Sequence, residues 1–259
     1  MSDEERWQVE GARSTHPWYA IGSAVMAALG GIVAAFVVTA LVGGVIAVLG
    51  ISMAPVPQFG LLFLAGAIGL GGTAVVYLRV RGLQLREYVG ARLPTLRELL
   101  WAGAGYVGAL SLIFAAGIVL TILNIAPETA NQAAKAGLKH PELLLWLVPM
   151  SFVVIAPAEE LLFRGVVQGR LREAFSPQVA ITETAALFAT VHYFSLTGGS
   201  GARFIAIAVL FLPSLVFGYV YERTGNLVVP ILIHGAYNAT LVLLVYISLK
   251  VMKTAPFAA

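Results

Sequence analysis

The sequence predicts an all-α membrane protein, a polytopic bundle of about seven transmembrane helices, or eight if its first apolar run divides. Of the 259 residues, 59% are hydrophobic and only 11% are charged, whereas soluble domains are about 25% charged. Seven runs are nearly free of charge and long enough to cross a hydrocarbon core about 30 Å thick. They lie at residues 18–50, 58–78, 99–124, 143–163, 177–197, 203–221 and 226–249.

These runs leave room for a single membrane domain. We expect a polar N-terminal tail at 1–16, N-terminal transmembrane helices at 17–142, a transmembrane core with polar motifs at 143–249 and a short C-terminal tail at 250–259. The N-terminal tail carries acidic as well as basic residues, unlike the basic n-region of a signal peptide. We therefore expect the first apolar segment to stay in the protein as a helix.

Local signals refine several of these segments. The run 18–50 is longer than one span requires, so it is expected to tilt, to break near residues 43–44 or to lie partly along the interface. The fifth span should begin at Ser176 and Pro177, an N-cap followed by proline at the first helical position. The glycine-rich segment 198–201 predicts a turn after that span. Glycines within the first two runs predict close helix packing.

The basic residues predict an integral protein of the cell membrane with a cytoplasmic N-terminus. In that orientation eleven of the 16 basic residues lie inside and five lie outside, as the positive-inside rule requires. The inside residues are Arg6, Arg13, Arg79, Arg81, Arg86, Arg92, Arg97, Arg164, Arg170, Arg172 and Arg223; the outside ones are Lys135, Lys139, Arg203, Lys250 and Lys253. Orientation explains the net charge of +3, so membrane lipids are expected as partners and nucleic acid is not.

The fourth span places charged side chains at membrane depth. Each costs about 2.5–3.5 kcal/mol there on insertion scales and by default marks a functional site. If the helix is continuous, Glu160 and Arg164 share a face and can form an ion pair. Glu159 then points about 100° away, free to face a cavity and exchange protons. The alternative is that both carboxylates only cap the end of a helix at the interface.

Two further spans carry pairs of side chains four residues apart. Phe188 and His192 share a face of the fifth span, and His234 and Asn238 share a face of the seventh, where Gly235 allows another backbone to approach. Hydrogen bonds between helices would explain each pair taken alone. Polar side chains thus occur in three spans that are otherwise nearly free of them. One shared, hydrated site explains this more simply than three unrelated sets of hydrogen bonds do.

The motifs Glu-Glu-x-x-x-Arg, Phe-x-x-x-His and His-x-x-x-Asn resemble those of the CPBP family of intramembrane glutamic peptidases. That family includes the type II CAAX prenyl endopeptidases and bacteriocin-processing or self-immunity membrane proteins. The segment 217–234 also resembles the run before the third motif, and the resemblance covers about residues 143–240. It implies an intramembrane endopeptidase without a cofactor, with CAAX-type processing favoured and a peptide or prenylated peptide as substrate.

The resemblance also implies roles for individual residues. The implied catalytic residues are Glu159, Glu160, His192, His234 and Asn238, supported by Arg164 and Phe188. Glu159 would be the general base for water, which His192 would position or polarise. His234 and Asn238 would donate hydrogen bonds to the tetrahedral oxyanion. Glu160, held by its arginine, would be an electrostatic support.

Two other functions stay open at this stage. Two histidines and a carboxylate can supply three zinc ligands with an open fourth position, although the His-Glu-x-x-His helix that most simply presents them is missing. A non-catalytic scaffold, a bacteriocin self-immunity protein or a transporter could use the same polar cluster to hold a partner or an ion. Because the chain has no cysteine, disulfides, cysteine-based zinc sites and a thiol nucleophile are excluded.

Overall fold

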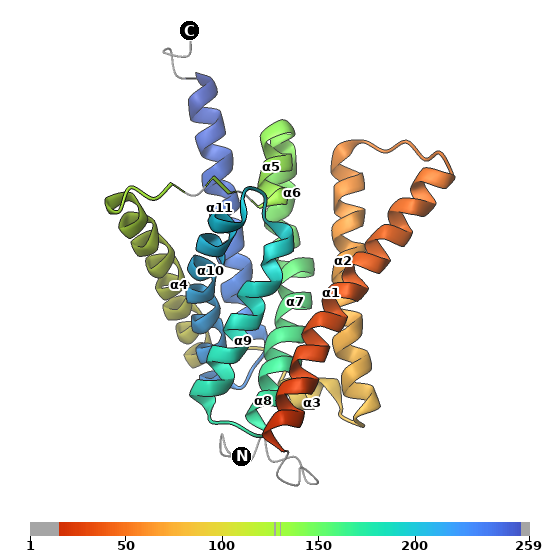
Figure 1. The fold of residues 1–259 in the computed structure, drawn as a ribbon, viewed down its shortest axis with the longest axis vertical. Coiled ribbons are helices and arrows are strands. Elements are labelled where there is room, and N and C mark those ends of the chain that lie inside the picture. Colours follow the sequence, from red (N-terminus) through yellow and green to blue (C-terminus); the bar gives the residue numbers. More distant parts are fainter. Residues whose placement is uncertain (1–15, 127, 130, 255–259) are drawn as a thin grey trace.

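The computed structural model describes residues 16–126, 128–129 and 131–254, which form a helical bundle (Figure 1). The separate long helices are α1 (Pro17–Val48), α2 (Pro55–Val80), α4 (Leu96–Ile122), α10 (Ser200–Thr224) and α11 (Val228–Thr254). The shorter ones are α3 (Leu85–Val89), α5 (Gln132–Lys139), α9 (Pro177–Val191) and the 3₁₀ turn η3 (His192–Ser195). The described residues contain no β-strand, only an isolated bridge between Asn131 and Leu196. The all-α class is therefore confirmed.

One further long helix runs without interruption from residue 141 to residue 172. Its α-helical turns are α6 (Pro141–Met150), α7 (Ala156–Glu160) and α8 (Gly169–Arg172), and its wider π-helical turns are η1 (Ser151–Ile155) and η2 (Leu161–Gln168). We call it the helix 141–172. It contacts α1, α2, α9, α10 and α11, so it lies at the centre of the bundle.

All seven expected runs form helices. Within the described residues, six helices are long and apolar enough to cross a membrane. The remaining run forms α9, which has only 15 residues and is about 22 Å long. The four residues of η3 extend it by roughly 8 Å, and Figure 1 shows the α9 segment running antiparallel to α10. The span expected at 177–197 therefore begins where it was predicted, but its α-helix ends earlier, at Val191.

The first apolar run forms one helix. α1 continues through residues 43–44, so the expected alternatives of a break there and of an eighth segment are wrong. Its 32 residues are about 48 Å long, more than a hydrocarbon core of about 30 Å requires, and Figure 1 shows α1 inclined to the other helices. The tail expected at 1–16 lies outside the described residues except for His16, and α11 extends past the expected limit of 249 to Thr254.

Small residues bring α1 against its neighbours. A Cβ on Gly69 of α2 would lie 2.4 Å from the backbone nitrogen of Ala35, and one on Gly31 of α1 would lie 2.4 Å from a methyl carbon of Leu162. Only glycine leaves room for these contacts, as expected for membrane helices. The α1–α2 hairpin is thereby packed against the helix 141–172.

A buried ion cluster ties the same elements together at the end where α1 begins. Glu173 accepts a hydrogen bond from Arg81 Nη1 at 2.6 Å and pairs with Arg170, whose Nε donates to Ser23 Oγ at 2.7 Å. The Tyr88 hydroxyl lies 3.3 Å from the Glu173 carboxylate. Burial, followed by the nearby Glu173 charge, raises the pKa of Tyr88 well above its usual value. Tyr88 therefore stays protonated and donates.

Candidate active site

The helix 141–172 places two carboxylates in different surroundings. Pro149 and Pro157 have no N–H group to donate to the preceding turn, and the π-helical turn η1 lies between them; such wide turns are frequent at functional sites. The helix still continues through Glu159 and Glu160. The Glu160 side chain is fully buried, whereas 17% of the Glu159 side chain is exposed.

Glu160 is held by Arg164. Glu160 Oε2 lies 3.0 Å from Arg164 Nε, and both side chains are fully buried, so the predicted ion pair is confirmed. Arg164 Nη2 also donates to Ser214 Oγ at 3.0 Å. The guanidinium carbon lies 5.2 Å from the ring centroid of Phe188 and 5.9 Å from that of Phe217. The pair thus has aromatic rings and a hydroxyl around it in place of water.

His234 connects the two carboxylates. Its Nδ1 lies 2.8 Å from Glu160 Oε1. Because an ionised carboxylate only accepts hydrogen bonds, Nδ1 carries the proton. The other nitrogen, Nε2, lies 3.7 Å from Glu159 Oε2. Glu160 therefore fixes both the orientation of the imidazole and the position of one of its protons.

His192 approaches Glu159 from α9. Its Nδ1 lies 2.7 Å from the carbonyl oxygen of Phe188, and since a carbonyl only accepts, Nδ1 is the donor. Its Nε2 lies 3.9 Å from Glu159 Oε2. At this residue α9 ends and η3 begins, and Ser195 Oγ donates to the His192 carbonyl at 2.9 Å. The shortness of α9 thus places His192 at the site.

Glu159 Oε2 faces both imidazoles. It is a buried atom with no hydrogen-bond partner among the described residues, and its distances of 3.7 and 3.9 Å to the two Nε2 atoms exceed the 2.7–3.2 Å or so of a direct hydrogen bond. Polar groups at such separations are commonly bridged by a water molecule. The arrangement can hold a water between one carboxylate and two imidazoles.

The structure does not bring Asn238 into hydrogen-bond contact with the other site residues. It is half-buried one turn beyond His234 on α11, and it makes no hydrogen bond to the part of the chain that the structure describes. Phe188 does join the site, since its ring centroid lies 4.5 Å from that of His192 and 5.8 Å from that of His234. No group of three or more His, Cys, Asp or Glu side chains among the described residues is arranged to hold a metal ion.

Two site residues on α10 were not predicted from the sequence. Ser214 accepts the hydrogen bond of Arg164, and the Phe217 ring stacks on His234 with centroids 5.0 Å apart and an interplanar angle of 22°. The available signals were a serine in an apolar span and the position of Phe217 at the start of the run before the third motif. Neither signal indicates a contact with the charged side chains.

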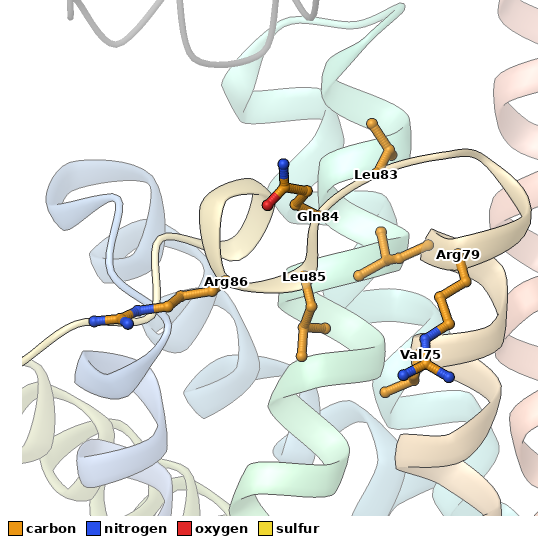
Figure 2. A pocket seen from close by; sticks show the side chains of 7 residues that line it. Val75, Arg79, Leu83, Gln84, Leu85 and Arg86 are labelled. Atoms are coloured by element: carbon orange, nitrogen blue, oxygen red, sulfur yellow. The ribbon is translucent and has the colours of Figure 1, made fainter.

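A separate cavity of about 370 Å³ lies where α2 meets α3 (Figure 2). Its lining residues are Val75, Leu78, Arg79, Leu83, Gln84, Leu85 and Arg86. No residue of the motifs lines it, and Figure 2 shows the Arg79 and Arg86 side chains directed away from each other. We therefore do not assign the chemistry of the motifs to this cavity.

Gly235 lets α11 approach the helix 141–172, as its place between His234 and Asn238 predicted. A Cβ at this position would lie 2.6 Å from the Phe152 ring, and such overpacking typically costs about 1–3 kcal/mol. Gly235→Ala is therefore expected to lower the thermal midpoint and to move His234 away from Glu159. The control is Gly108→Ala on α4, where a Cβ would meet nothing within 4 Å; equal stability of the two variants would contradict this expectation.

Comparison with known proteins finds one family similar to part of this chain. Residues 141–240 match the model of a family described as type II CAAX prenyl endopeptidase Rce1-like. Comparison with curated proteins and with solved structures gives no significant match. The matched segment contains both carboxylates, Arg164, both site histidines and Asn238. This segment is therefore similar to the Rce1-like family of type II CAAX prenyl endopeptidases.

Proposed function

We propose that this protein is an intramembrane glutamic endopeptidase in which Glu159 activates the water that hydrolyses the peptide bond. The observation that carries the proposal is the position of Glu159 Oε2, which lies 3.7 Å from Nε2 of His234 and 3.9 Å from Nε2 of His192. A water at this point would touch one base and two imidazoles. The family match supports a membrane endopeptidase in general.

The two carboxylates are suited to different tasks. Glu160 has both oxygens engaged, one by Arg164 at 3.0 Å and the other by His234 at 2.8 Å, so it is poorly placed to accept another proton. Glu159 is partly exposed, and its Oε2 has no hydrogen-bond partner among the described residues. Glu159 is therefore the general base in our proposal, and Glu160 orients His234.

The reaction then proceeds in two proton transfers. Glu159 takes a proton from water as the water oxygen attacks the carbonyl carbon, and the carbonyl oxygen becomes an oxyanion. Because its Nδ1 is protonated, His192 offers the lone pair of Nε2 to the second hydrogen of the water. Glu159 next gives its proton to the departing nitrogen as the C–N bond breaks. The carboxylate is thereby regenerated and the products are a carboxylic acid and an amine.

His234 is placed to stabilise the oxyanion. Since its Nδ1 proton is directed to Glu160, the imidazole can donate from Nε2 only in its doubly protonated form. Asn238 would supply a second donor after rotation of its amide toward the substrate. Removing one donor of this kind typically costs about 10²–10³ in kcat.

We further propose that the substrate is a prenylated peptide and that the protein lies in the cell membrane with its N-terminus in the cytoplasm. The family description supports the substrate class. The distribution of basic residues supports the orientation. A buried site within a bundle of apolar helices also suits a substrate that carries its own lipid anchor.

Cleavage of fluorogenic peptides by the purified protein in detergent tests this proposal. The peptides are matched pairs with and without a C-terminal farnesyl-cysteine motif, each assayed with and without a chelator. We expect cleavage of the farnesylated peptide that resists chelation. Loss of activity on chelation with recovery on adding Zn²⁺ would favour the zinc alternative, and no cleavage by the folded protein would favour a scaffold or immunity protein.

A further inference from the structure

Phe217 of α10 lies against two side chains of the site, Arg164 and His234. It is 1% exposed, and its ring stacks on the imidazole of His234 with an interplanar angle of 22°. The Arg164 guanidinium lies over the same ring, with its carbon 5.9 Å from the centroid. Tyr237 meets the ring edge-on, with centroids 5.9 Å apart, and so fixes the ring in place.

The stacking contact limits how His234 can turn. Rotation of an imidazole about its second side-chain torsion is otherwise soft. A ring stacked on one face and a hydrogen bond from Nδ1 to Glu160 on one edge together leave one orientation. In that orientation Nε2 is directed to Glu159.

The ring of Phe217 also lies against the buried ion pair. An aromatic face carries partial negative charge and attracts cations, most strongly where water is excluded. The Arg164 guanidinium, which pairs with Glu160, lies over this ring. Phe217 therefore contacts both Arg164 and His234, the two side chains that Glu160 holds.

We propose that Phe217 is a positioning residue of the peptidase. It holds the imidazole of His234 with Nε2 toward Glu159. This inference rests on the proposed function for its effect on catalysis. Its structural half, the orientation of the His234 imidazole, is independent of any substrate.

Phe217→Leu tests the catalytic half, with Phe163→Leu as its matched control. Phe163 is also 1% exposed, and it contacts Phe188 with ring centroids 5.1 Å apart. The two variants remove the same ring from equally buried positions, so their losses of thermal stability should be similar. A misplacement of about 1 Å among the reacting groups can cost about 10²-fold in rate, and loss of the stacked ring loosens the imidazole of His234 by less than that. We expect kcat to fall about tenfold in Phe217→Leu with KM unchanged, and to fall less than twofold in Phe163→Leu.

Nitrogen NMR of ¹⁵N-histidine-labelled protein tests the structural half at a fixed neutral pH. The His234 signals are assigned by their loss in His234→Asn. We expect the Nδ1 proton of His234, which is held toward Glu160 in the wild type, to exchange with solvent faster in Phe217→Leu than in the wild type and in Phe163→Leu. If Phe217→Leu does not fold, Phe217→Met, which also lacks a ring, replaces it.

The outcomes separate this inference from the proposed function. Unchanged kcat and unchanged His234 signals in Phe217→Leu, in a protein that cleaves peptides, would overturn the role of Phe217 and leave the peptidase proposal standing. Equal losses of kcat in the Phe217→Leu and Phe163→Leu variants would likewise show a packing effect only. A wild type that cleaves no peptide would refute the peptidase, while the NMR comparison would still decide how Phe217 acts on His234.

Discussion

Replacing Glu159 by glutamine is expected to lower kcat by about 10²–10⁴-fold, the usual contribution of a positioned general base. Glutamine keeps the size and shape of the side chain but cannot take a proton from water. Because 17% of the Glu159 side chain is exposed and its Oε2 has no hydrogen-bond partner among the described residues, the substitution breaks no direct hydrogen bond of that oxygen. We therefore expect a thermal midpoint close to that of the wild type.

Glu160→Gln is the matched control, since it makes the same change at the next residue. Glu160 is fully buried and pairs with Arg164 and His234, so this variant leaves Arg164 without its counter-charge. We expect it to lose thermal stability as well as activity. Initial rates on the cleaved peptide and the midpoint of thermal denaturation in detergent distinguish the two. Substantial activity in Glu159→Gln would refute the role of Glu159 as general base. A marked loss of thermal stability in that variant would contradict the proposal that Glu159 acts in catalysis while Glu160 supports the structure.

Much of the fold follows from the sequence because a membrane allows few alternatives. An apolar run that crosses lipid must satisfy its backbone hydrogen bonds internally, so each of the seven runs could be predicted as a helix and each is one. The Glu160–Arg164 ion pair was predictable for the same reason, since only the helical repeat is needed to place residues four apart on one face. What each residue does in catalysis stays a prediction.

Contacts between helices could not be predicted in this way. The hydrogen bond from His234 to Glu160 depends on how α11 is rotated against the helix 141–172, and periodicity within a single helix carries no such information. The stacking of Phe217 on His234 depends likewise on the placement of α10. The search for charge-free runs also failed to show that α9 ends at Val191, because the residues of η3, His192–Ser195, include no Asp, Glu, Lys or Arg and two of them are aromatic.

Arg164→Met is expected to have the largest effect on stability. Removing one partner of a buried ion pair leaves the other charge uncompensated and typically costs about 3–5 kcal/mol. Here both partners are fully buried, and Arg164 also donates to Ser214. For a chain of about this size, such a loss corresponds to a fall of roughly 6–20 °C in the thermal midpoint. Thermal denaturation followed by circular dichroism in detergent measures it.

Arg92→Met makes the same substitution in an ion pair whose arginine is partly solvated. Its partner Glu98 is largely buried, whereas 48% of the Arg92 side chain is exposed. Because Glu98 keeps the hydrogen bonds from the backbone N–H and the hydroxyl of Thr95, we expect a smaller fall in the thermal midpoint than in Arg164→Met. Comparable losses in the Arg164→Met and Arg92→Met variants would contradict the assignment of Arg164 to a dry, buried pair.

The double variant Glu160→Gln with Arg164→Met tests whether the ion pair contributes only to stability or also to catalysis. Since it leaves neither charge unpaired, it should regain part of the stability lost in Arg164→Met, as replaced buried pairs often do. Activity should not return with it, because the double variant lacks the Glu160 carboxylate that orients the imidazole of His234. Recovery of both properties together would mean that the pair acts only in folding. Recovery of stability without activity would mean that the ion pair also contributes to catalysis.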